Sequence, residues 1–379
     1  MSIVFLATGC SYITGGTDNS EPPMPLAKIK PEKKFVKLWS EKVGGGDYSE
    51  YLKLKPLALD SQIVTIDGRG TVQARNSLTG KLIWKNNLNK KVNSGVSGNS
   101  EKLFIGFADG NIAALDATSG KLLWQHPLDK NILSSSFYDS KNVYVQTTDG
   151  TLSSLDGLTG KLNWEYKVLV PDLTLYATSS PIVWGNMVIA GFSNGKIMAF
   201  NKATGNPEWD YQIATPNGRS NIQRMVDINA SPVVNGGVLY AVSYQGNMVA
   251  VDLNNGAELW KFSLSSINDF TVNYKHIYVS DTEGTVWALN RDNGRVLWQQ
   301  NNLHMRELSG TNFLEDTIVV GDYAGYFHGL ANNHGGIIAR GKLGGSGIRV
   351  APLVKNDIMY ILDNSGRLAA YKLESMRKA

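Results

Sequence analysis

Few side chains of this 379-residue sequence could carry out covalent or metal chemistry, and their spacing does not suggest an active site. The single cysteine, Cys10, excludes a disulfide framework, a zinc site built on thiolates and an iron-sulfur cluster. No Gly-x-Ser-x-Gly elbow occurs, and acidic residues recur with the turns rather than as an acid-base pair. The five histidines lack metal-ligand spacing and stand far apart, at His126, His276, His304, His328 and His334. We therefore expect no catalytic residue, no metal site and no cofactor.

Cys10 is the one candidate for covalent modification. A short apolar run, Ile3 to Ala7, leads into the residues Leu6 to Cys10, and polar sequence with Gly and Pro follows at once. This resembles the end of a bacterial lipoprotein signal peptide, in which small residues precede the cysteine that is acylated. The resemblance implies lipidation of Cys10, and Ser11, in place of an Asp, implies export to the outer membrane. The alternative is a free cysteine beside a chance apolar run.

The residues after Cys10 differ in composition from the rest of the chain. Residues 11–33 are rich in Pro, Gly, Thr and Lys, which predicts a flexible tether between a lipid anchor and a folded domain. We place the domain at residues 34–373, after a signal remnant at 1–10 and this tether, and before a tail at 374–379. No apolar run approaches the roughly 20 residues that span a bilayer.

The net charge is small and concentrated in one segment. The chain has 37 basic and 33 acidic residues, a net charge of +4, which is too weak to indicate nucleic-acid binding. Between Lys28 and Lys42 there are six lysines against Glu32 and Glu41, so this segment alone carries +4. The remainder of the chain is close to neutral.

Eight copies of one unit fill the domain. Each contains a Gly-x-apolar-x-small-apolar-Asp/Asn strand, and the copies begin at Gly70, Gly110, Gly150, Gly195, Gly246, Gly284, Gly325 and Gly366. The intervals are 40, 40, 45, 51, 38, 41 and 41 residues. A period near 40 residues with β patterning predicts an all-β fold, an eight-bladed β-propeller.

Each unit is punctuated by two kinds of turn. Asp-Gly pairs such as Asp109-Gly110, between alternating apolar runs, predict tight hairpins and four antiparallel strands per blade. Six units continue into Asp/Asn-x-x-x-Gly-x-x-x-Trp, for example from Asp116 through Gly120 to Trp124. We expect the Asp to accept backbone N–H bonds in the turn, the Gly to supply a positive φ, and the Trp to pack on the adjoining blade. The other five tryptophans of the set are Trp84, Trp164, Trp209, Trp260 and Trp298.

The two ends of the repeat array complement each other. The eighth unit stops at Leu373 before an outer strand or a tryptophan appears, and the segment Phe35 to Trp39 has the pattern of that missing strand. We therefore predict that this segment closes the ring, with Ala339 replacing the tryptophan of the seventh unit. Such a closure hides sheet edges. The alternative is seven blades plus a loose end.

The Asp/Asn-x-x-Thr-Gly-Lys-x-x-Trp repeats resemble those of quinoprotein alcohol dehydrogenases, whose eight-bladed propellers hold pyrroloquinoline quinone and a calcium ion. Members of that family are longer and commonly place a vicinal cysteine pair at the quinone, whereas the only cysteine here is Cys10. A periplasmic quinoprotein-like dehydrogenase is therefore kept as an alternative function. A second alternative is a propeller that binds another envelope protein or a cell-wall ligand.

The combination of lipobox, short tether and compact ring resembles the BamB family of outer-membrane protein assembly factors over essentially the whole chain. The resemblance implies a non-catalytic scaffold subunit of the β-barrel assembly machinery, lipid-anchored at the periplasmic face of the outer membrane. It implies docking on the periplasmic POTRA domains of BamA, with the other subunits contacted indirectly. Exposed outer-strand edges could also pair with unfolded β-barrel precursors.

Two loop motifs carry this resemblance and define the candidate partner-binding residues. Leu173-Thr-Leu175-Tyr176 stands where the family often has Leu-x-Leu-Arg, and Arg224-Met-Val-Asp227-Ile-Asn229 stands where it has Arg-x-x-Asp-x-Asp. Because Tyr176 and Asn229 depart from the family's Arg and Asp, ion pairs made by those residues elsewhere are lost here. A partner with compensating changes would be needed.

The same segments stand out by length alone. They occupy the connections where the tryptophan spacing rises from 40 to 45 and then to 51 residues. Connections from an outer strand to the next inner strand emerge on one face, so we expect these two to form one recognition surface. Leu173 and Leu175 would be apolar anchors, and Arg224 and Asp227 would orient the partner by charge-assisted bonds. The alternative is that the two leucines begin an inner strand and face the core.

Overall fold

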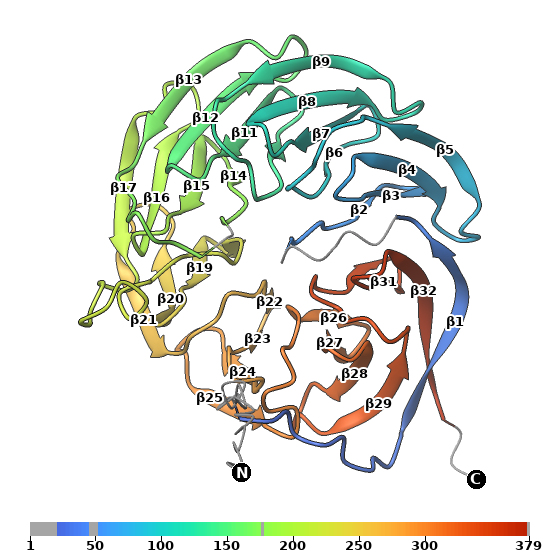
Figure 1. Ribbon diagram of the computed structural model, residues 1–379. Coiled ribbons are helices and arrows are strands. Elements are labelled where there is room, and N and C mark those ends of the chain that lie inside the picture. Colours follow the sequence, from blue (N-terminus) through green and yellow to red (C-terminus); the bar gives the residue numbers. More distant parts are fainter. Residues whose placement is uncertain (1–20, 45–51, 176–177, 377–379) are drawn as a thin grey trace, which may run out of the picture.

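The strands of the chain form a closed ring of radially arranged sheets (Figure 1). The structure, a computed structural model, describes residues 21–44, 52–175 and 178–376. Within these ranges, strands β1 to β32 form eight four-stranded antiparallel sheets, which we call blades 1 to 8 in chain order. The prediction of an eight-bladed propeller is confirmed, and the alternative with seven blades is wrong. No helix in the described ranges is long and apolar enough to cross a membrane.

Blades 1 to 4 each consist of four consecutive strands that run from the centre of the ring to its rim. Blade 1 contains β2 (Leu57–Ala58), β3 (Gln62–Ile66), β4 (Thr71–Asn76) and β5 (Leu82–Asn87). Blade 2 contains β6 (Ser97–Gly98), β7 (Lys102–Gly106), β8 (Asn111–Asp116) and β9 (Leu122–Pro127). Blade 3 contains β10 (Phe137–Tyr138), β11 (Asn142–Gln146), β12 (Thr151–Asp156) and β13 (Leu162–Lys167). Blade 4 contains β14 (Ile182–Trp184), β15 (Met187–Gly191), β16 (Lys196–Asn201) and β17 (Pro207–Gln212).

Blades 5 to 7 repeat this order, and blade 8 is completed by the first strand of the chain. Blade 5 contains β18 (Val233–Asn235), β19 (Val238–Val242), β20 (Asn247–Asp252) and β21 (Glu258–Ser263). Blade 6 contains β22 (Thr271–Val272), β23 (His276–Ser280), β24 (Val286–Asn290) and β25 (Val296–Gln300). Blade 7 contains β26 (Asn312–Leu314), β27 (Thr317–Gly321), β28 (Tyr326–Ala331) and β29 (Ile337–Lys342). Blade 8 contains β30 (Leu353–Lys355), β31 (Ile358–Leu362), β32 (Arg367–Ser375) and β1 (Lys33–Lys42).

The hydrophobic core lies between neighbouring blades. The two middle strands of a blade, such as β7 and β8, are buried on both faces and are almost continuously apolar. The outer strand β9 instead has alternating exposure, because only one of its faces meets a neighbour. Between blades 1 and 2, for example, Val64 and Ile66 pack with Leu103 and Ile105.

Seven tryptophans join consecutive blades in the predicted way. The indole Nε1 of Trp84 donates to the backbone carbonyl of Ala117 at 3.0 Å, in the turn between the third and fourth strands of blade 2. Gly120 of the same turn, with φ of +69°, lies against the indole ring, where a Cβ would approach within 2.4 Å. Asp116 Oδ1 accepts the turn amides of Thr118 and Ser119. The same indole–carbonyl bond is made by Trp39, Trp124, Trp164, Trp209, Trp260 and Trp298.

Blade 8 closes the ring as predicted. Strand β1 pairs antiparallel with β32, from Lys33 opposite Ser375 to Lys42 opposite Arg367. The pairing is therefore longer than in any regular blade, and it includes residues 374 and 375, so the predicted boundary between domain and tail at residue 373 is two residues too early. Trp39 bonds the carbonyl of Ser77 and so joins blade 8 to blade 1.

The junction between blades 7 and 8 lacks a tryptophan. Ala339 occupies the corresponding position, opposite Gly329, in the register that places Trp84 opposite Ala74 in blade 1. Phe35 of β1 fills the space instead, because its ring lies 4.9 Å from that of Phe327 and within van der Waals reach of Gly329. The first strand thus both completes blade 8 and replaces the missing indole.

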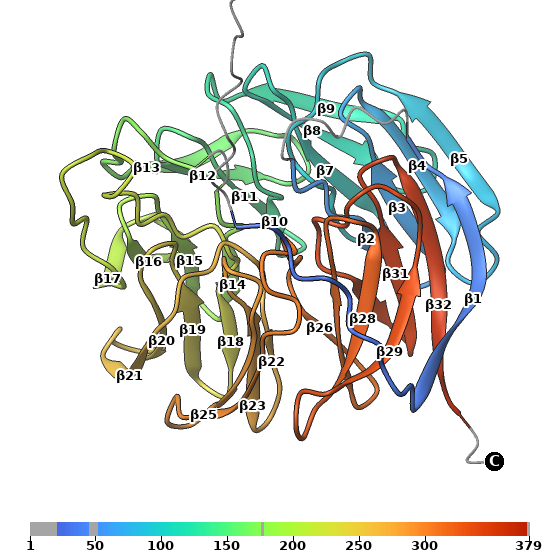
Figure 2. The same ribbon diagram turned by 60° about the horizontal axis from the view of Figure 1, so that its bottom comes forward.

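Residues 21–32, which we call the strap, lie along the outside of blade 7 before β1 begins (Figures 1 and 2). Met24 N donates to His304 O at 3.0 Å, Arg340 Nη1 to Ala27 O at 2.8 Å, and Glu32 N to Ile338 O at 2.9 Å. The flexible tether predicted for residues 11–33 therefore does not describe residues 21–32. The strap is polar in composition, but two of its carbonyls have arginine partners in the domain: Arg340 of β29 donates to Ala27 O, and Arg306 of the segment between β25 and β26 donates to Met24 O. Residues 11–20 lie outside the described ranges.

Candidate protein-docking face

All segments that join an outer strand to the next inner strand emerge on one face of the ring, which we call the connection face. This follows from four antiparallel strands per blade, since the fourth strand ends at the level where the next first strand begins. Two of these segments are longer than the others between β5 and β30. They are residues 168–181, between β13 and β14, and residues 213–232, between β17 and β18.

The two long connections touch each other through Asp227. The amide of Leu175 in the first connection donates to Asp227 Oδ1 in the second at 3.0 Å. The backbone carbonyl of Asp227 in turn accepts the amide of Tyr244 at 2.8 Å, which fixes it to a turn of blade 5. The prediction that the two insertions form one surface is supported by this direct bond.

The carboxyl group of Asp227 is electrostatically unusual. Its side chain is 0% exposed, and no basic side chain of the described residues forms an ion pair with it. Burial raises the pKa of Asp227 to about 6, although the Ser193 side chain and the Leu175 amide act in the opposite direction. Near neutral pH the site therefore holds a buried carboxylate that only neutral groups compensate.

Blade 7 shows what the same backbone position looks like when it is neutralised. There Arg306 takes the place of Asp227, because its carbonyl accepts the Tyr323 amide as the Asp227 carbonyl accepts that of Tyr244. The Arg306 guanidinium bonds Asp322 at 2.7 Å, and both side chains are buried. In blade 5 the position of Asp322 is taken by Ser243. The charge at Asp227 is thus both reversed and left without a counter-ion in the described part of the chain.

The residues around Asp227 are packed into the ring. The side chain of Ile228 lies against Gly191, where a Cβ would come within 2.3 Å of Ile228 Cγ2, so blade 4 needs a glycine there. The amide of Ile228 donates to Phe192 O at 3.3 Å. Asn229 is also buried. Residues 225–230 therefore form a fixed base for the second connection.

Exposed residues lie on the outer side of this base. Leu173 of the first connection is 42% exposed. Arg224 is exposed on a tight turn, where its Nη2 donates to Asn221 Oδ1 at 2.6 Å. Gln245 Nε2 donates to the carbonyl of Ile222 at 3.0 Å, which holds this turn against blade 5. The surface thus offers an apolar group and a cation on braced segments.

The six predicted partner-binding residues therefore divide into different roles. Leu173 and Arg224 are exposed, and Leu175 is half-buried with its amide on Asp227. The prediction that Asp227 contacts a partner directly does not fit this structure, because its carboxyl group is buried. The carboxyl group instead accepts the Leu175 amide and so positions Leu175. Asn229 is enclosed as well. Tyr176 and the lipidation candidate Cys10 lie outside the described residues.

The alternative for Leu173 and Leu175 is wrong in this structure. The inner strand of blade 4 begins only at Ile182, so both leucines belong to the connection that precedes it. The motifs also missed two more exposed apolar residues, Leu169 at 87% and Ile222 at 63%. The sequence could have identified both, because each is an apolar residue within an unusually long, polar connection. This criterion does not depend on either motif.

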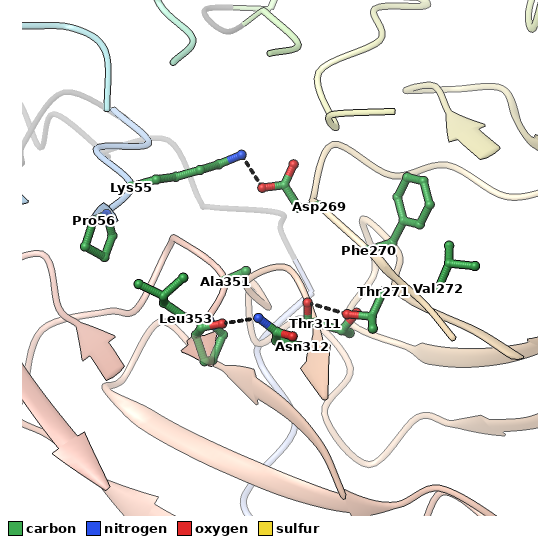
Figure 3. A pocket seen from close by; sticks show the side chains of 11 residues that line it. Lys55, Pro56, Asp269, Phe270, Thr271, Val272, Thr311, Asn312, Ala351 and Leu353 are labelled. Atoms are coloured by element: carbon green, nitrogen blue, oxygen red, sulfur yellow. Dashed lines mark hydrogen bonds and ion pairs between the residues drawn. The ribbon is translucent and has the colours of Figure 1, made fainter. Parts of the chain in front are cut away.

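A pocket lies near the axis of the ring (Figure 3). It has a volume of about 340 Å³ and is lined by Lys55, Asp269, Phe270, Thr311, Asn312 and Leu353, among others. Lys55 forms an ion pair with Asp269, and the half-buried Lys53 donates to Ile267 O. Burial lowers the pKa of Lys53 to about 8. Burial alone would raise the pKa of Asp269, but the two lysines hold it at about 2.

This central site does not fit a calcium–quinone pair. Among the described residues that line it, Asp269 alone is acidic, and two lysines neutralise it. No group of three His, Cys, Asp or Glu side chains in the described ranges could hold a metal ion. Calcium requires six to eight oxygen ligands, most often including several carboxylates. The donor set is therefore that of an internal ion pair.

Comparison with known proteins identifies a family over nearly the whole chain. The family profile described as outer membrane protein assembly factor BamB matches residues 68–300. The chain is 43% identical to the outer membrane protein assembly factor BamB of Pseudomonas aeruginosa, with 98% of this chain and 97% of that protein aligned. The crystal structure of BamB from Moraxella catarrhalis superposes with a TM-score of 0.82 and 26% identity, covering 89% of this chain and 99% of that one.

Quinoproteins share the fold at a greater distance. The quinohemoprotein alcohol dehydrogenase of Pseudomonas putida superposes with a TM-score of 0.70 at 15% identity, covering 91% of this chain and 77% of that one. At this identity the likeness concerns the propeller architecture alone. It does not favour the dehydrogenase alternative.

Proposed function

The chain belongs to the BamB family of outer membrane protein assembly factors, and from this premise we propose that it is a non-catalytic scaffold subunit docked on the POTRA domains of BamA. Its relatives are named for assembly of outer-membrane proteins, which points to a non-enzymatic role in the β-barrel assembly machinery and to an outer-membrane-associated periplasmic location. Lipidation of Cys10 would anchor it there, and a stable anchor needs more than one acyl chain.

The bond between Leu175 and Asp227 is the observation that supports docking at the connection face. It joins two connections that are 52 positions apart in sequence and holds their exposed sides together. Ordered loops on a rigid scaffold are common recognition surfaces, and exposed leucines beside an arginine provide an anchor and an orienting charge. In this arrangement Leu173, Leu169, Ile222 and Arg224 contact the partner, and Asp227 positions the first connection.

The buried carboxylate explains why this surface is suited to binding rather than stability alone. A buried charge without a counter-ion costs free energy in the free protein. A partner cation that reached the neighbourhood of Asp227 would lower that cost, so the charge favours a basic group on the partner side. This role is one of electrostatic complementarity and requires no chemistry.

Unfolded β-barrel precursors are a second class of partner that the outer rim supports. The outermost strands β5, β9 and β25 each expose a pair of apolar residues, namely Leu82 and Ile83, Leu122 and Leu123, and Val296 and Leu297, and β21 exposes Leu259. Among the strands that the structure describes, each outer strand also has one edge without a strand partner, and the edge of β29 lies beside the strap. An extended precursor segment could add to such an edge by main-chain hydrogen bonds.

Affinity capture with immobilised BamA POTRA domains tests the docking proposal. The double variant Leu173→Glu/Arg224→Glu should lose capture by at least tenfold, because it removes the anchor and reverses the orienting charge. The control Leu123→Glu/Arg295→Glu makes the same chemical changes on the rims of blades 2 and 6, where both residues are also exposed. It should bind as the unchanged protein does.

Three outcomes are informative. Loss of capture in the connection-face variant alone supports the assignment. Equal capture by both variants would remove the site from the connection face. Failure of the unchanged protein to capture the POTRA domains would overturn the docking function itself, since both variants are expected to keep the fold and can be checked by thermal unfolding.

A further inference from the structure

The whole net charge of the protein resides on one part of its rim. Residues 28–42 contain six lysines and two glutamates, a net charge of +4, and the remaining 31 basic and 31 acidic residues cancel. In the structure these residues form the end of the strap and strand β1, on the outside of blades 7 and 8 (Figure 1). The ring is therefore an almost neutral disc with a basic edge on one side.

Much of this charge is not neutralised within the protein. Lys33 pairs with Asp316 and Lys34 with Glu374. The other lysines of the segment are exposed and make no ion pair with any described residue: Lys28, Lys30, Lys37 and Lys42. We call these four the rim lysines. Met24 and Leu38, each 40% exposed, lie on the same strap and strand.

The strap holds this edge in a fixed geometry. Besides the bonds of Met24, Ala27 and Glu32 described above, Arg306 Nη1 donates to Met24 O at 3.0 Å, and Leu26 packs against the core between blades 6 and 7. The first described residue, Glu21, pairs with His304 at 3.3 Å. Because His304 belongs to the segment that joins β25 to β26, Glu21 lies at the connection face beside blade 7.

Covalent geometry limits the distance between Glu21 and a lipid anchor on Cys10. Eleven residue steps separate Glu21 from Cys10, and an extended chain spans about 3.5 Å per residue, so the two are at most about 40 Å apart. A lipid on Cys10 would therefore keep blades 7 and 8 near the membrane. The edge that the anchor brings to the membrane is thus the basic one.

We propose that this basic edge binds an anionic phospholipid surface, so that blades 7 and 8 face the membrane and the long connections of blades 4 and 5 point away from it. The proposal builds on the lipid anchor of the proposed function and adds a second membrane contact. Lysines near an anionic bilayer bind by electrostatic attraction, and exposed apolar side chains such as Leu38 and Met24 can enter the interface. The acyl anchor and the basic edge together would fix the orientation of the ring relative to the membrane, which a flexible anchor alone would not.

Vesicle sedimentation with the full chain carrying Cys10→Ser tests the lipid contact without the acyl chains. The probes are vesicles of phosphatidylcholine with and without phosphatidylglycerol, at low and high salt. Each lysine near an anionic surface contributes about fivefold to binding. Exchange of the four rim lysines for Glu should therefore weaken binding to phosphatidylglycerol vesicles on the order of 600-fold, and salt should weaken binding of the unchanged protein.

The control exchanges for Glu four exposed lysines at a different part of the rim. Lys81, Lys85, Lys121 and Lys161 lie on blades 1 to 3, are exposed, and have no ion-pair partner in the described ranges. Both variants change the net charge from +4 to −4, so they differ only in the place of the charge. Equal loss in the two variants, or equal binding to neutral vesicles, would overturn the proposal.

Orientation gives an independent readout. A fluorophore on Leu38→Cys, in the Cys10→Ser background, should be quenched by headgroup quenchers in phosphatidylglycerol vesicles, and one on Leu123→Cys of blade 2 should not. Equal quenching at both positions would contradict the orientation. Capture of POTRA domains should be unchanged in the rim variant, so a failure of docking and a failure of lipid binding are told apart.

Discussion

Blade 8 and the long connections of blades 4 and 5 lie on opposite sides of the ring and use buried groups in opposite ways. At blade 8, Trp39 and Phe35 of the first strand fill apolar space, and the indole N–H has a carbonyl partner. At blades 4 and 5, the central group is the carboxyl of Asp227, which is buried without a counter-ion. Blade 8 therefore stabilises the closed ring, whereas the buried charge of Asp227 destabilises the free protein and can be compensated when a partner binds.

The largest effect should come from the indole at the closing blade. Trp39→Ala removes a side chain that is 8% exposed and one of the two donors to Ser77 O, so we expect the free energy of unfolding to fall by about 3 to 5 kcal/mol. Urea unfolding measures it. Trp184→Ala, on an exposed indole of blade 4, should cost much less. Similar losses at both positions would mean that blade 8 is no more critical than blade 4.

A second effect concerns the turn under that indole. Gly80 has φ of +70°, and a Cβ there would lie 2.7 Å from the Trp39 ring, so Gly80→Ala should cost about 2 to 4 kcal/mol from backbone strain and overlap. Gly236 of blade 5 has φ of +62° with open space around it, so Gly236→Ala should cost only about 1 kcal/mol. Calorimetric midpoints of the two variants compare them directly. Equal shifts would show that the ring contact adds nothing to the φ requirement.

The third effect has the opposite sign and belongs to the connection face. The pKa of Asp227 is raised from 3.8 to about 6, so the folded protein binds the proton more tightly than the unfolded chain. Stability should therefore fall as the pH rises from about 4 to 6. Asp227→Asn keeps an acceptor for the Leu175 amide and removes the charge, so it should stabilise the protein near neutral pH by about 1 to 3 kcal/mol.

Asp116 provides the control for this pH dependence. Its Ser119 and Thr118 hydrogen bonds lower the pKa of the Asp116 carboxyl, so its contribution to stability is lost as the pH falls, opposite in direction to that of Asp227. Unfolding measured across the acid range in Asp227→Asn and Asp116→Asn should show these opposite trends. If the stability of Asp227→Asn depended on pH in the same way as that of the unchanged protein, the Asp227 charge would not be a source of destabilisation.

The smallest effect is expected at the strap. Arg340→Gln removes the bond from Nη1 to Ala27 O at 2.8 Å, which should lower the free energy of unfolding by less than about 1 kcal/mol. Hydrogen exchange should become faster at the amide of Met24 and stay slow at Glu32, which lies next to β1. Slow exchange at both amides would show that the strap does not depend on blade 7 for its order.

Features that recur along the sequence could be predicted, and features that depend on distant residues could not. The period placed every blade, and the Trp and Gly positions fixed the contacts between blades, because a repeated contact appears as a repeated spacing. The replacement of a tryptophan by Phe35 was not predicted, since Phe35 meets Phe327 only after the ring has closed. The strap was not predicted either, because Arg340 and Ala27 are 313 positions apart.

The candidate site shows the same limit. The motifs located Leu173 and Asp227 on neighbouring connections, but the enclosure of Asp227 depends on the packing of Ile228 against Gly191, which no motif contains. A polar residue in a long connection is usually expected to be exposed, so charge type alone suggested direct contact. Only the burial of each side chain distinguishes the exposed anchor, Leu173, from the buried residue that positions the connection, Asp227.

The pairing of β1 with β32 also sets an order of events during synthesis. Lys33 and Ser375 are more than 300 positions apart, whereas the strands within blades 1 to 7 find their partners within about 40 residues. The first strand made must therefore wait, without its ladder, until the last one has been translated. Until then blades 1 and 8 present unprotected edges, so a chain interrupted near its end is the species most prone to aggregate.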